Sequence, residues 1–404
     1  MPRLDARFGD GGVARAPLKF PEFREFGVPL RPVRQADGKV LVAAQFSGER
    51  EAKGVVLARF DRAGALDKTF GRRGRVRIAF PWRLRWLRVL AQRDGRIVLV
   101  GPLGGPAHFS SQPIQLGIVK LLPDGSRDLS FGTKGFVAWN PPWRAADAWM
   151  DVVPGLALPQ PDGRLLVAAT VQERALSPGS TFWESVVLVR FGADGSVDQS
   201  FGQRGFAELA WEGGYFHGWA RLADGRLGSI VTRHEGGETF ESQAWWLHSF
   251  TADGSPAALR PTGSVRLGLN VLNELTELVP TSDGALLMVG RVQVNHARGP
   301  APAVRRVLPD GSLDPTFGRK CGHPLLRAYT QGGASTPDGG VLVSTGTLVI
   351  PYDATGCIAA SPLRLRGLGA GPPLVQRGRS ALLGAIFSDS DGLAGGLALI
   401  KIRR

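Results

Sequence analysis

The chain has 404 residues, of which 43% are hydrophobic and 21% are charged, a balance typical of a globular protein with a sizeable core. No run of 18 apolar residues occurs, which excludes a transmembrane helix. The formal charge of +14 would suit a polyanionic partner. Only eight of the 49 basic residues are Lys, however, and the Arg residues are scattered along the chain, so we do not expect a nucleic-acid partner.

The N-terminus and the cysteines bear on the cellular compartment. Residues 1–9 contain no apolar segment of the kind that a signal peptide needs. Either the protein is cytoplasmic, or a leader precedes this sequence. The two cysteines, Cys321 and Cys357, are too few for a metal cluster or a disulfide scaffold.

A first turn signal, an Asp-Gly pair between two apolar runs, recurs along the chain. Asp and Gly tolerate the backbone angles of tight turns, so each pair predicts a β-hairpin. The copies are Asp37-Gly38, Asp94-Gly95, Asp162-Gly163, Asp224-Gly225, Asp283-Gly284 and Asp338-Gly339, with a degenerate seventh at Arg377-Gly378.

A second signal, Leu-Asp-x-x-Phe-Gly or a close variant, follows most hairpins after a further apolar strand. It begins with a Gly-Ser or Gly-Ala turn, and another strand comes after it. Its copies end at Gly71, Gly132, Gly202 and Gly318, and an isolated copy ends at Gly9 near the N-terminus.

Each unit therefore holds four short strands in roughly 55 to 65 residues, which is typical of a propeller blade. We predict an all-β fold, a seven-bladed β-propeller with four antiparallel strands per blade and a single domain over 1–404. The last unit lacks a fourth strand and the chain begins with an orphan motif. Residues 1–18 are therefore expected to complete the blade formed by 372–404 and to close the ring.

These motifs resemble the delta-60 repeat family of bacterial proteins, in which Leu-Asp-x-x-Phe-Gly-x-x-Gly follows an Asp-Gly-Ser turn. The resemblance implies a β-propeller and often an exported bacterial protein, and it brings no catalytic residues with it. Two units depart from the pattern, because 254–260 has lost the Asp and the Phe and 356–360 has lost almost the whole motif.

The repeated motif residues have a structural and a functional interpretation. A ring of carboxylates could serve a metal or acid–base chemistry, but an Asp repeated in five units more often accepts backbone N–H groups in its own loop. The repeated Phe rings are interpreted as plugs buried between blades. The residues concerned are Asp5, Phe8, Asp67, Phe70, Asp128, Phe131, Asp198, Phe201, Asp314 and Phe317.

Cys321 and Cys357 fall in corresponding loops of two consecutive units, which are expected to be neighbours. A disulfide here would close a loop of about 36 residues and would stabilise the fold by roughly 3 to 4 kcal/mol. It would point to an extracytoplasmic location. A free thiol pair stays the alternative.

The hairpin turns and the motif loops share one face of the predicted ring, which we name the motif face. The opposite face, named the loop face, is irregular and is the functional candidate. It is expected to be rich in aromatic and Arg residues, types enriched at binding hot spots, and packing of the rings onto the sheets is the alternative. The candidate binding residues are Trp82, Trp139, Trp143, Trp149, Trp183, Trp211, Tyr215, Arg144, His217 and His234.

Three functional hypotheses follow. The first is a non-catalytic binding propeller for a protein or glycan partner. The second is a hydrolase or lyase with an axial pocket on the same face, built from loop histidines such as His217 and His234. The third is a polyanion-binding module. We expect no cofactor, no metal, no catalytic residue and a monomer, and an extracytoplasmic location is favoured while a cytoplasmic one stays open.

Overall fold

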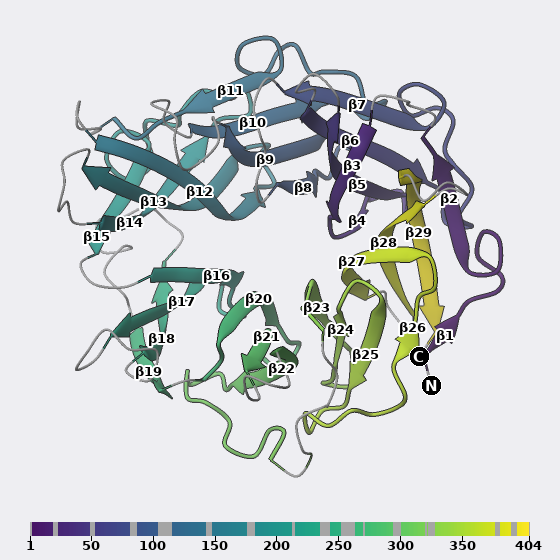
Figure 1. Ribbon diagram of the computed structural model, residues 1–404. Coiled ribbons are helices and arrows are strands. Elements are labelled where there is room, and N and C mark those ends of the chain that lie inside the picture. The colour runs from purple at the N-terminus through teal and green to yellow at the C-terminus, as the bar shows by residue number, and fades with distance from the viewer. Residues whose placement is uncertain are drawn as a thin grey trace.

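The seven sheets of the computed structural model stand in a ring around a central opening (Figure 1). The structure describes residues 2–18, 23–48, 53–80, 87–103, 115–142, 148–175, 182–211, 215–234, 243–251, 263–269, 271–293, 300–319, 321, 328–375, 380–388 and 394–403. All regular elements in these ranges are strands. No helix of membrane-spanning length and hydrophobicity occurs in them.

Each of the first four blades is an antiparallel sheet whose strands run in chain order. Blade 1 contains β3 (Phe23–Pro29), β4 (Val33–Arg34), β5 (Val40–Gly48), β6 (Lys53–Phe60) and β7 (Arg75–Phe80). Blade 2 contains β8 (Arg88–Ala91), β9 (Ile97–Leu103), β10 (Gln115–Leu121) and β11 (Phe136–Trp139). Blade 3 contains β12 (Ala148–Pro159), β13 (Leu165–Ala175), β14 (Phe182–Phe191) and β15 (Phe206–Trp211). Blade 4 contains β16 (Tyr215–Arg221), β17 (Leu227–His234), β18 (Gln243–Phe250) and β19 (Gly263–Leu269).

The remaining three blades complete the ring. Blade 5 contains β20 (Glu274–Pro280), β21 (Leu286–Gln293) and β22 (Pro300–Val307), and it has three strands in the described part of the chain where four were expected. Blade 6 contains β23 (Gly332–Ser335), β24 (Val341–Ser344), β25 (Leu348–Tyr352) and β26 (Leu363–Arg364). Blade 7 contains β27 (Leu368–Val375), β28 (Ser380–Ser388) and β29 (Ala394–Arg403), to which β1 (Arg3–Leu4) and β2 (Val13–Pro17) add.

The two ends of the chain close the ring within blade 7. Leu4 of β1 lies opposite Ile402, and Val13 of β2 lies opposite Ile400, both on β29. The N and C termini consequently lie side by side (Figure 1). The predicted seven-bladed propeller with a composite last blade is confirmed.

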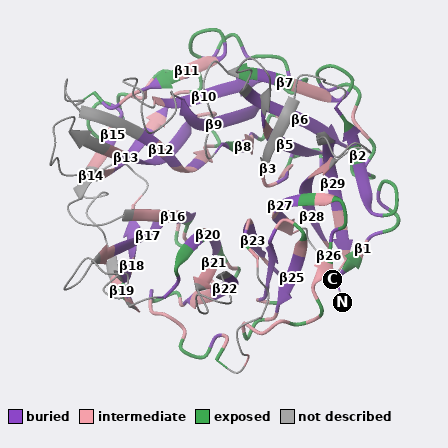
Figure 2. Cartoon of the chain, viewed as in Figure 1, coloured by how far each residue is buried: buried purple, intermediate pink, exposed green. Residues whose placement is uncertain are grey.

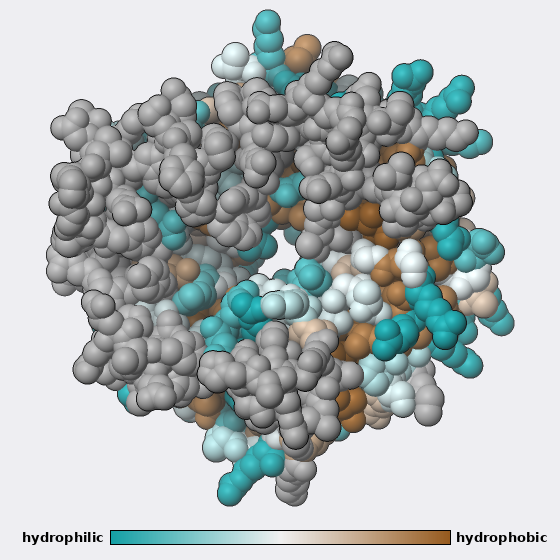
Figure 3. All heavy atoms as spheres, in the orientation of Figure 1, coloured by the Kyte–Doolittle hydropathy of each residue, from teal (hydrophilic) through white to brown (hydrophobic). Residues whose placement is uncertain are grey.

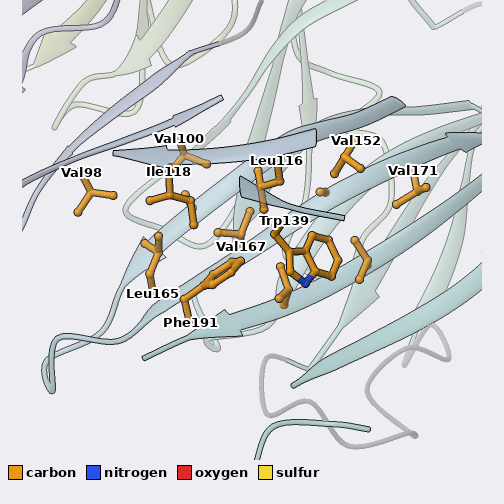
Figure 4. Close-up of a cluster of buried hydrophobic side chains, with 14 of the residues drawn as sticks. Val98, Val100, Leu116, Ile118, Trp139, Val152, Leu165, Val167, Val171 and Phe191 are labelled. Carbon is orange, nitrogen blue, oxygen red and sulfur yellow. The ribbon is translucent and has the colours of Figure 1, made fainter. Parts of the chain in front are cut away.

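The core lies between neighbouring blades because both faces of each sheet are covered. β9 reads Ile-Val-Leu-Val-Gly-Pro-Leu and is buried at every position. One cluster joins Val100 and Ile118 of blade 2 to Val167 and Phe191 of blade 3 (Figure 4). β9 and β10, the two middle strands of blade 2, are accordingly buried along almost all of their length (Figure 2).

The Asp-Gly pairs form the inner hairpin turns. Gly38 has a φ of +86°, a conformation that residues with a Cβ rarely adopt. The Asp37 carboxylate accepts the Lys39 backbone N–H at 3.0 Å, which closes the turn.

Candidate functional site

Ion pairs within blades 1, 2 and 3 show that the hairpin turns and the motif loops share one face. Lys39, next to the turn of blade 1, lies 3.0 Å from the Asp67 carboxylate of the motif loop. Arg96 approaches Asp128 to 3.1 Å in the same way, and Arg164 approaches Asp198 to 3.0 Å. This is the motif face, and the other end of every blade belongs to the loop face.

Each motif Asp closes its own loop. The Asp67 carboxylate accepts the Thr69 backbone N–H at 3.1 Å and the Thr69 hydroxyl at 2.6 Å. The backbone bond recurs at Asp5, Asp128, Asp198 and Asp314. The hydroxyl bond recurs at Asp128, Asp198 and Asp314. Burial alone would raise the pKa of Asp67, but hydrogen bonds from Thr69 and Lys39 and the charge of Arg59 hold that pKa well below its usual range.

A cation on the third strand of the blade completes each motif, and sequence reasoning missed it. Arg59 donates from Nε to Asp67 at 2.8 Å, and its guanidinium lies 4.5 Å from the Phe70 ring centroid. The signal was present in the sequence, because a basic residue stands eight positions before four of the motif Asp residues. These residues are Arg59, Lys120, Arg190 and Arg306, and Lys401 contacts Asp5 in the closing blade.

The motif Phe and the Gly after it join one blade to the next. A Cβ added to Gly125 of blade 2 would lie 2.7 Å from the Phe70 ring of blade 1, so only glycine fits there. The Gly71 backbone N–H donates to the Asp124 carbonyl at 2.6 Å. Equivalent bonds run from Gly9 to Ala63, from Gly132 to Asp194 and from Gly318 to Thr355. Phe201 is also buried, but the turn that would face it lies outside the described residues.

A disulfide joins Cys321 and Cys357, with their Cα atoms 5.4 Å apart. It links the motif loop of blade 5 to the turn of blade 6, beside the Gly318 to Thr355 hydrogen bond. The joint between blades 5 and 6 is therefore covalent.

A pocket of about 420 Å³ lies on the motif face at the joint between blades 2 and 3. Here Lys120 occupies the position of Arg59 and Arg190, and its amine donates to the Ala193 carbonyl at 2.9 Å. Lys carries a single ammonium in place of the broad planar guanidinium of Arg. A second pocket, of about 410 Å³, adjoins the joint between blades 1 and 2, where the cation is Arg59. Both pockets are therefore gaps beside joints.

The residues predicted for the loop face fall into three groups. Trp82, Trp143 and Arg144 lie outside the described residues. Trp139 is only 8% exposed and packs edge-on against Phe191, with ring centroids 6.4 Å apart (Figure 4). The prediction of Trp139 as a binding residue needs correction, because its ring belongs to the core between blades 2 and 3.

The remaining predicted residues lie in strands and not in loops, because the strands of blades 3 and 4 extend further than the turn signals suggested. Strand register brings three Trp residues to the same end of blade 3. Trp149 is paired with Arg174, Trp183 with Glu173, and Trp211 with Glu184. This end lies opposite the Asp162-Gly163 turn and is therefore on the loop face. Tyr215 and His234 stand at the corresponding end of blade 4.

His217 on β16 is held inside blade 4. Its ring stacks on Trp245 with centroids 5.5 Å apart, and its Nε2 lies 2.8 Å from the Thr232 hydroxyl. Burial lowers the pKa of His217 to about 4. The ring is therefore neutral at pH 7, and no carboxylate contacts it among the described residues.

An exposed aromatic residue stands on the loop face where blades 5 and 6 meet. Tyr329 is 61% exposed, and the Arg291 guanidinium lies 4.8 Å from its ring centroid. Arg291 in turn pairs with Glu274. A hydrogen bond of 2.6 Å between Thr276 and Thr330 joins the two blades beside it. Sequence reasoning did not select Tyr329.

The central opening contains a charged cluster that no repeat explains. Arg31 of blade 1 donates to Glu277 of blade 5 at 2.5 Å, to the Gly333 carbonyl of blade 6 at 2.6 Å and to the Pro373 carbonyl of blade 7. The Gly333 backbone N–H donates to the second oxygen of Glu277 at 2.9 Å. Among the described residues, no group of three or more His, Cys, Asp or Glu side chains could hold a metal.

Three segments of the chain match one family model. It is described as "Domain of unknown function (DUF5122) beta-propeller", and the matched residues are 35–70, 92–131 and 281–317. Each segment runs from an inner hairpin turn to the Phe of a motif, in blades 1, 2 and 5. The match supports a β-propeller family, and the narrower resemblance to the delta-60 repeat stays a prediction. No curated protein matches the sequence.

Three solved structures match this chain along most of its length. A protein of unknown function from Dyadobacter fermentans has a TM-score of 0.48 at 10% identity, covering 97% of this chain and 99% of its own. The polysaccharide lyase Uly1 has a TM-score of 0.49 at 12% identity, covering 98% and 93%. The Neurospora crassa Pan2 WD40 domain has a TM-score of 0.47 at 10% identity, covering 99% and 97%. None of these likenesses supports an activity.

Proposed function

We propose that this protein is a non-catalytic binding propeller that holds a protein or glycan partner on its loop face. The observation that carries the proposal is the strand register of blade 3, which brings Trp149, Trp183 and Trp211 to one end of one sheet. Aromatic residues gathered at a blade end can stack on sugar rings or fill pockets of a partner protein. Tyr215 and His234 stand at the same end of blade 4 and are included in the proposed binding region.

The contacts of the repeated motif residues favour the loop face over the motif face as the binding surface. On the motif face, the motif carboxylates bind their own loops and neighbouring cations, and Phe70 and Phe131 contact glycines of the next blade. These groups hold blades together and are not available for a ligand. Tyr329, fixed by Arg291, adds an exposed ring to the opposite face.

The hydrolase or lyase alternative receives less support. His217 has a lowered pKa because of burial, and its Nε2 faces a Thr hydroxyl and not a carboxylate. A general acid or base needs a partner that tunes it and a reachable substrate. We also propose an extracytoplasmic location, which the disulfide supports because such bonds persist in oxidising compartments.

Arrays of immobilised oligosaccharides and of immobilised peptides, probed with the labelled protein, test the proposal. The test variant carries Trp149→Ala and Trp183→Ala, and Tyr329→Ala extends the test to blades 5 and 6. Leu129→Ala is the matched control, since Leu129 is 70% exposed but lies in a motif loop on the other face. We expect at least tenfold weaker retention for the Trp variant and unchanged retention for the control. Equal retention by the wild type and the Trp variant would contradict the proposal.

A further inference from the structure

The pocket of about 410 Å³ beside the joint between blades 1 and 2 is lined by arginine side chains. β7 and the loop before it supply Arg72, Arg75 and Arg77, and the turn between β10 and β11 of blade 2 supplies Asp124 and Ser126. β7 is the outermost strand of blade 1 (Figure 1), so the pocket lies away from the hollow at the centre of the molecule (Figure 3).

Two arginines of this pocket lack the carboxylate partners that the other pocket provides. In the pocket between blades 2 and 3, Arg96 pairs with both Asp94 and Asp128. By contrast, Arg72 and Arg75 form no ion pair in the described part of the chain, and the buried Nε of Arg75 has no hydrogen-bond partner there. A buried donor without a partner is costly, and an anion in the pocket would provide the missing acceptor.

The guanidinium of Arg75 is held in place by its own loop. Its Nη1 donates to the Arg73 carbonyl at 3.0 Å. This bond leaves the edge of the guanidinium formed by Nε and Nη2 for a ligand. Two parallel N–H donors on one edge are the arrangement with which arginine binds phosphate or carboxylate oxygens in a bidentate pair.

The other copies of the loop show that the fold does not need arginine at these two positions. In blade 1 the Arg72 backbone N–H donates to the Arg75 carbonyl at 2.8 Å. The same backbone bond closes the loops of blades 2, 3 and 7, where the corresponding pairs are Thr133 and Phe136, Gln203 and Phe206, and Asp10 and Val13. Because neutral, acidic and apolar residues occupy the two positions elsewhere, the two charges in blade 1 are not required by the loop itself.

The carboxylate of the pocket selects the body of the ligand. Oδ1 of Asp124 accepts the Ser126 backbone N–H at 2.9 Å and the Ser126 hydroxyl at 2.7 Å. Ser126 uses only Oδ1, so Oδ2 can accept a hydrogen bond from a ligand. A carboxylate repels a bare anion but accepts a hydroxyl. The volume of about 410 Å³ lies in the range of pockets for small molecules, so a phosphate ester of a hydroxyl-rich molecule matches the pocket.

We propose that the pocket beside the joint between blades 1 and 2 binds a sugar phosphate, in which Arg72 and Arg75 contact the phosphate group and Asp124 accepts a sugar hydroxyl. The site uses none of the motif Asp and Phe side chains that hold the blades together. It lies on the motif face and is independent of the loop-face partner proposed above.

Calorimetric titration with glucose 6-phosphate tests the site, with glucose and sodium phosphate as the two halves of that ligand. We expect glucose 6-phosphate to bind and to raise the thermal midpoint, because a ligand that binds only the folded state stabilises it. Glucose should not bind, because it has no charge for the arginines. Sodium phosphate should bind at least about tenfold more weakly than glucose 6-phosphate, because it meets the Asp124 charge without a sugar hydroxyl to offer.

The first test variant carries Arg72→Thr and Arg75→Phe, which gives blade 1 the residues that blade 2 has at these positions. Its affinity for glucose 6-phosphate should fall at least about tenfold, as expected for the loss of charged hydrogen bonds. Its thermal midpoint without ligand should stay near that of the wild type, because the loop of blade 2 folds with these residues. Arg75→Gln, which adds no ring to the pocket, should lose affinity in the same direction.

The matched control carries Arg127→Gln and Arg204→Gln. Both residues are exposed in the motif loops of blades 2 and 3, and neither lines the pocket. The control removes as many positive charges as the first test variant and should bind glucose 6-phosphate like the wild type.

Three results would overturn the proposal. The first is a wild-type protein that binds no glucose 6-phosphate up to about 10 mM. The second is a folded test variant that retains the wild-type affinity for this ligand. The third is equal affinity of the wild type for sodium phosphate and glucose 6-phosphate, which would contradict the role of Asp124. None of these results affects the array experiment on the loop face, so the two proposals fail separately.

Discussion

The joint between blades 1 and 2 and the joint between blades 5 and 6 connect neighbouring sheets at the same place in the repeat. In the first, Phe70 packs against Gly125, and Arg59 lies over the ring and pairs with Asp67. In the second, Phe317 packs against Gly356 in the same way.

The two joints differ in their cation. Arg306 lies 3.7 Å from Asp314 and also pairs with Asp283 of its own blade, and no cation lies over Phe317 among the described contacts. The disulfide between Cys321 and Cys357 stands beside this weaker joint. Where the cation contact is weaker, a covalent bond holds the two blades together. The same joint of the repeat can therefore be held by different interactions.

The largest expected effect comes from removing the ring of the first joint. Phe70→Ala should lower the free energy of unfolding by about 3 to 5 kcal/mol, because Phe70 is fully buried and its loss leaves a cavity. Phe317→Ala should cost less, because the disulfide keeps the turn of blade 6 in place. Urea unfolding followed by Trp fluorescence measures both. A larger loss for Phe317→Ala under oxidising conditions would contradict the comparison.

Much of this fold was predictable because the repeat is explicit. Six Asp-Gly pairs and one degenerate Arg-Gly pair marked seven hairpins. The orphan motif ending at Gly9 indicated that the two ends share a blade. The site was harder to predict. Trp139 was selected for its position after a strand, but the sequence does not say that this strand end folds against Phe191. Arg31 was not selected, because its contacts depend on blades distant in sequence meeting at the central opening.

Removing the disulfide is the second test of the comparison. Replacing both Cys321 and Cys357 by Ser should lower the free energy of unfolding by about 3 to 4 kcal/mol, the value expected when a loop of 36 residues is released in the unfolded chain. A thiol reductant should lower the stability of the wild type by the same amount and leave the double variant unchanged. If the reductant has no effect on the wild type, the second joint does not depend on its covalent bond.

Lowering the pH should destabilise the joint between blades 1 and 2 more than the joint between blades 5 and 6. Because the folded-state pKa of Asp67 lies below its unfolded value, its contribution to stability is complete above about pH 4 and is lost as the pH falls further. Asp67→Asn should cost about 2 to 3 kcal/mol at pH 7, since it leaves the buried Arg59 without its carboxylate.

The difference between the wild type and Asp67→Asn should shrink as the pH falls below about 4. Urea midpoints measured between pH 7 and pH 3 give this difference directly. Asp10→Asn is the control, because the Asp10 side chain is 95% exposed, and its effect should be small at every pH. If the loss of stability in Asp67→Asn does not depend on pH, the Asp67 carboxylate of the wild type contributes through its shape and not through its charge.

The smallest effect on stability is expected at the joint between blades 2 and 3. Lys120→Arg should raise the free energy of unfolding by about 0.5 to 1 kcal/mol, because a guanidinium can fill part of the adjoining pocket and pair with Asp128 as Arg59 pairs with Asp67. Lys120→Met is the matched control, because it keeps a similar length but removes the charge, and it should destabilise the protein. A loss of stability in Lys120→Arg would show that this joint does not accept a guanidinium in place of the ammonium. The cation position would then be adjusted separately at each joint and would not be interchangeable around the ring.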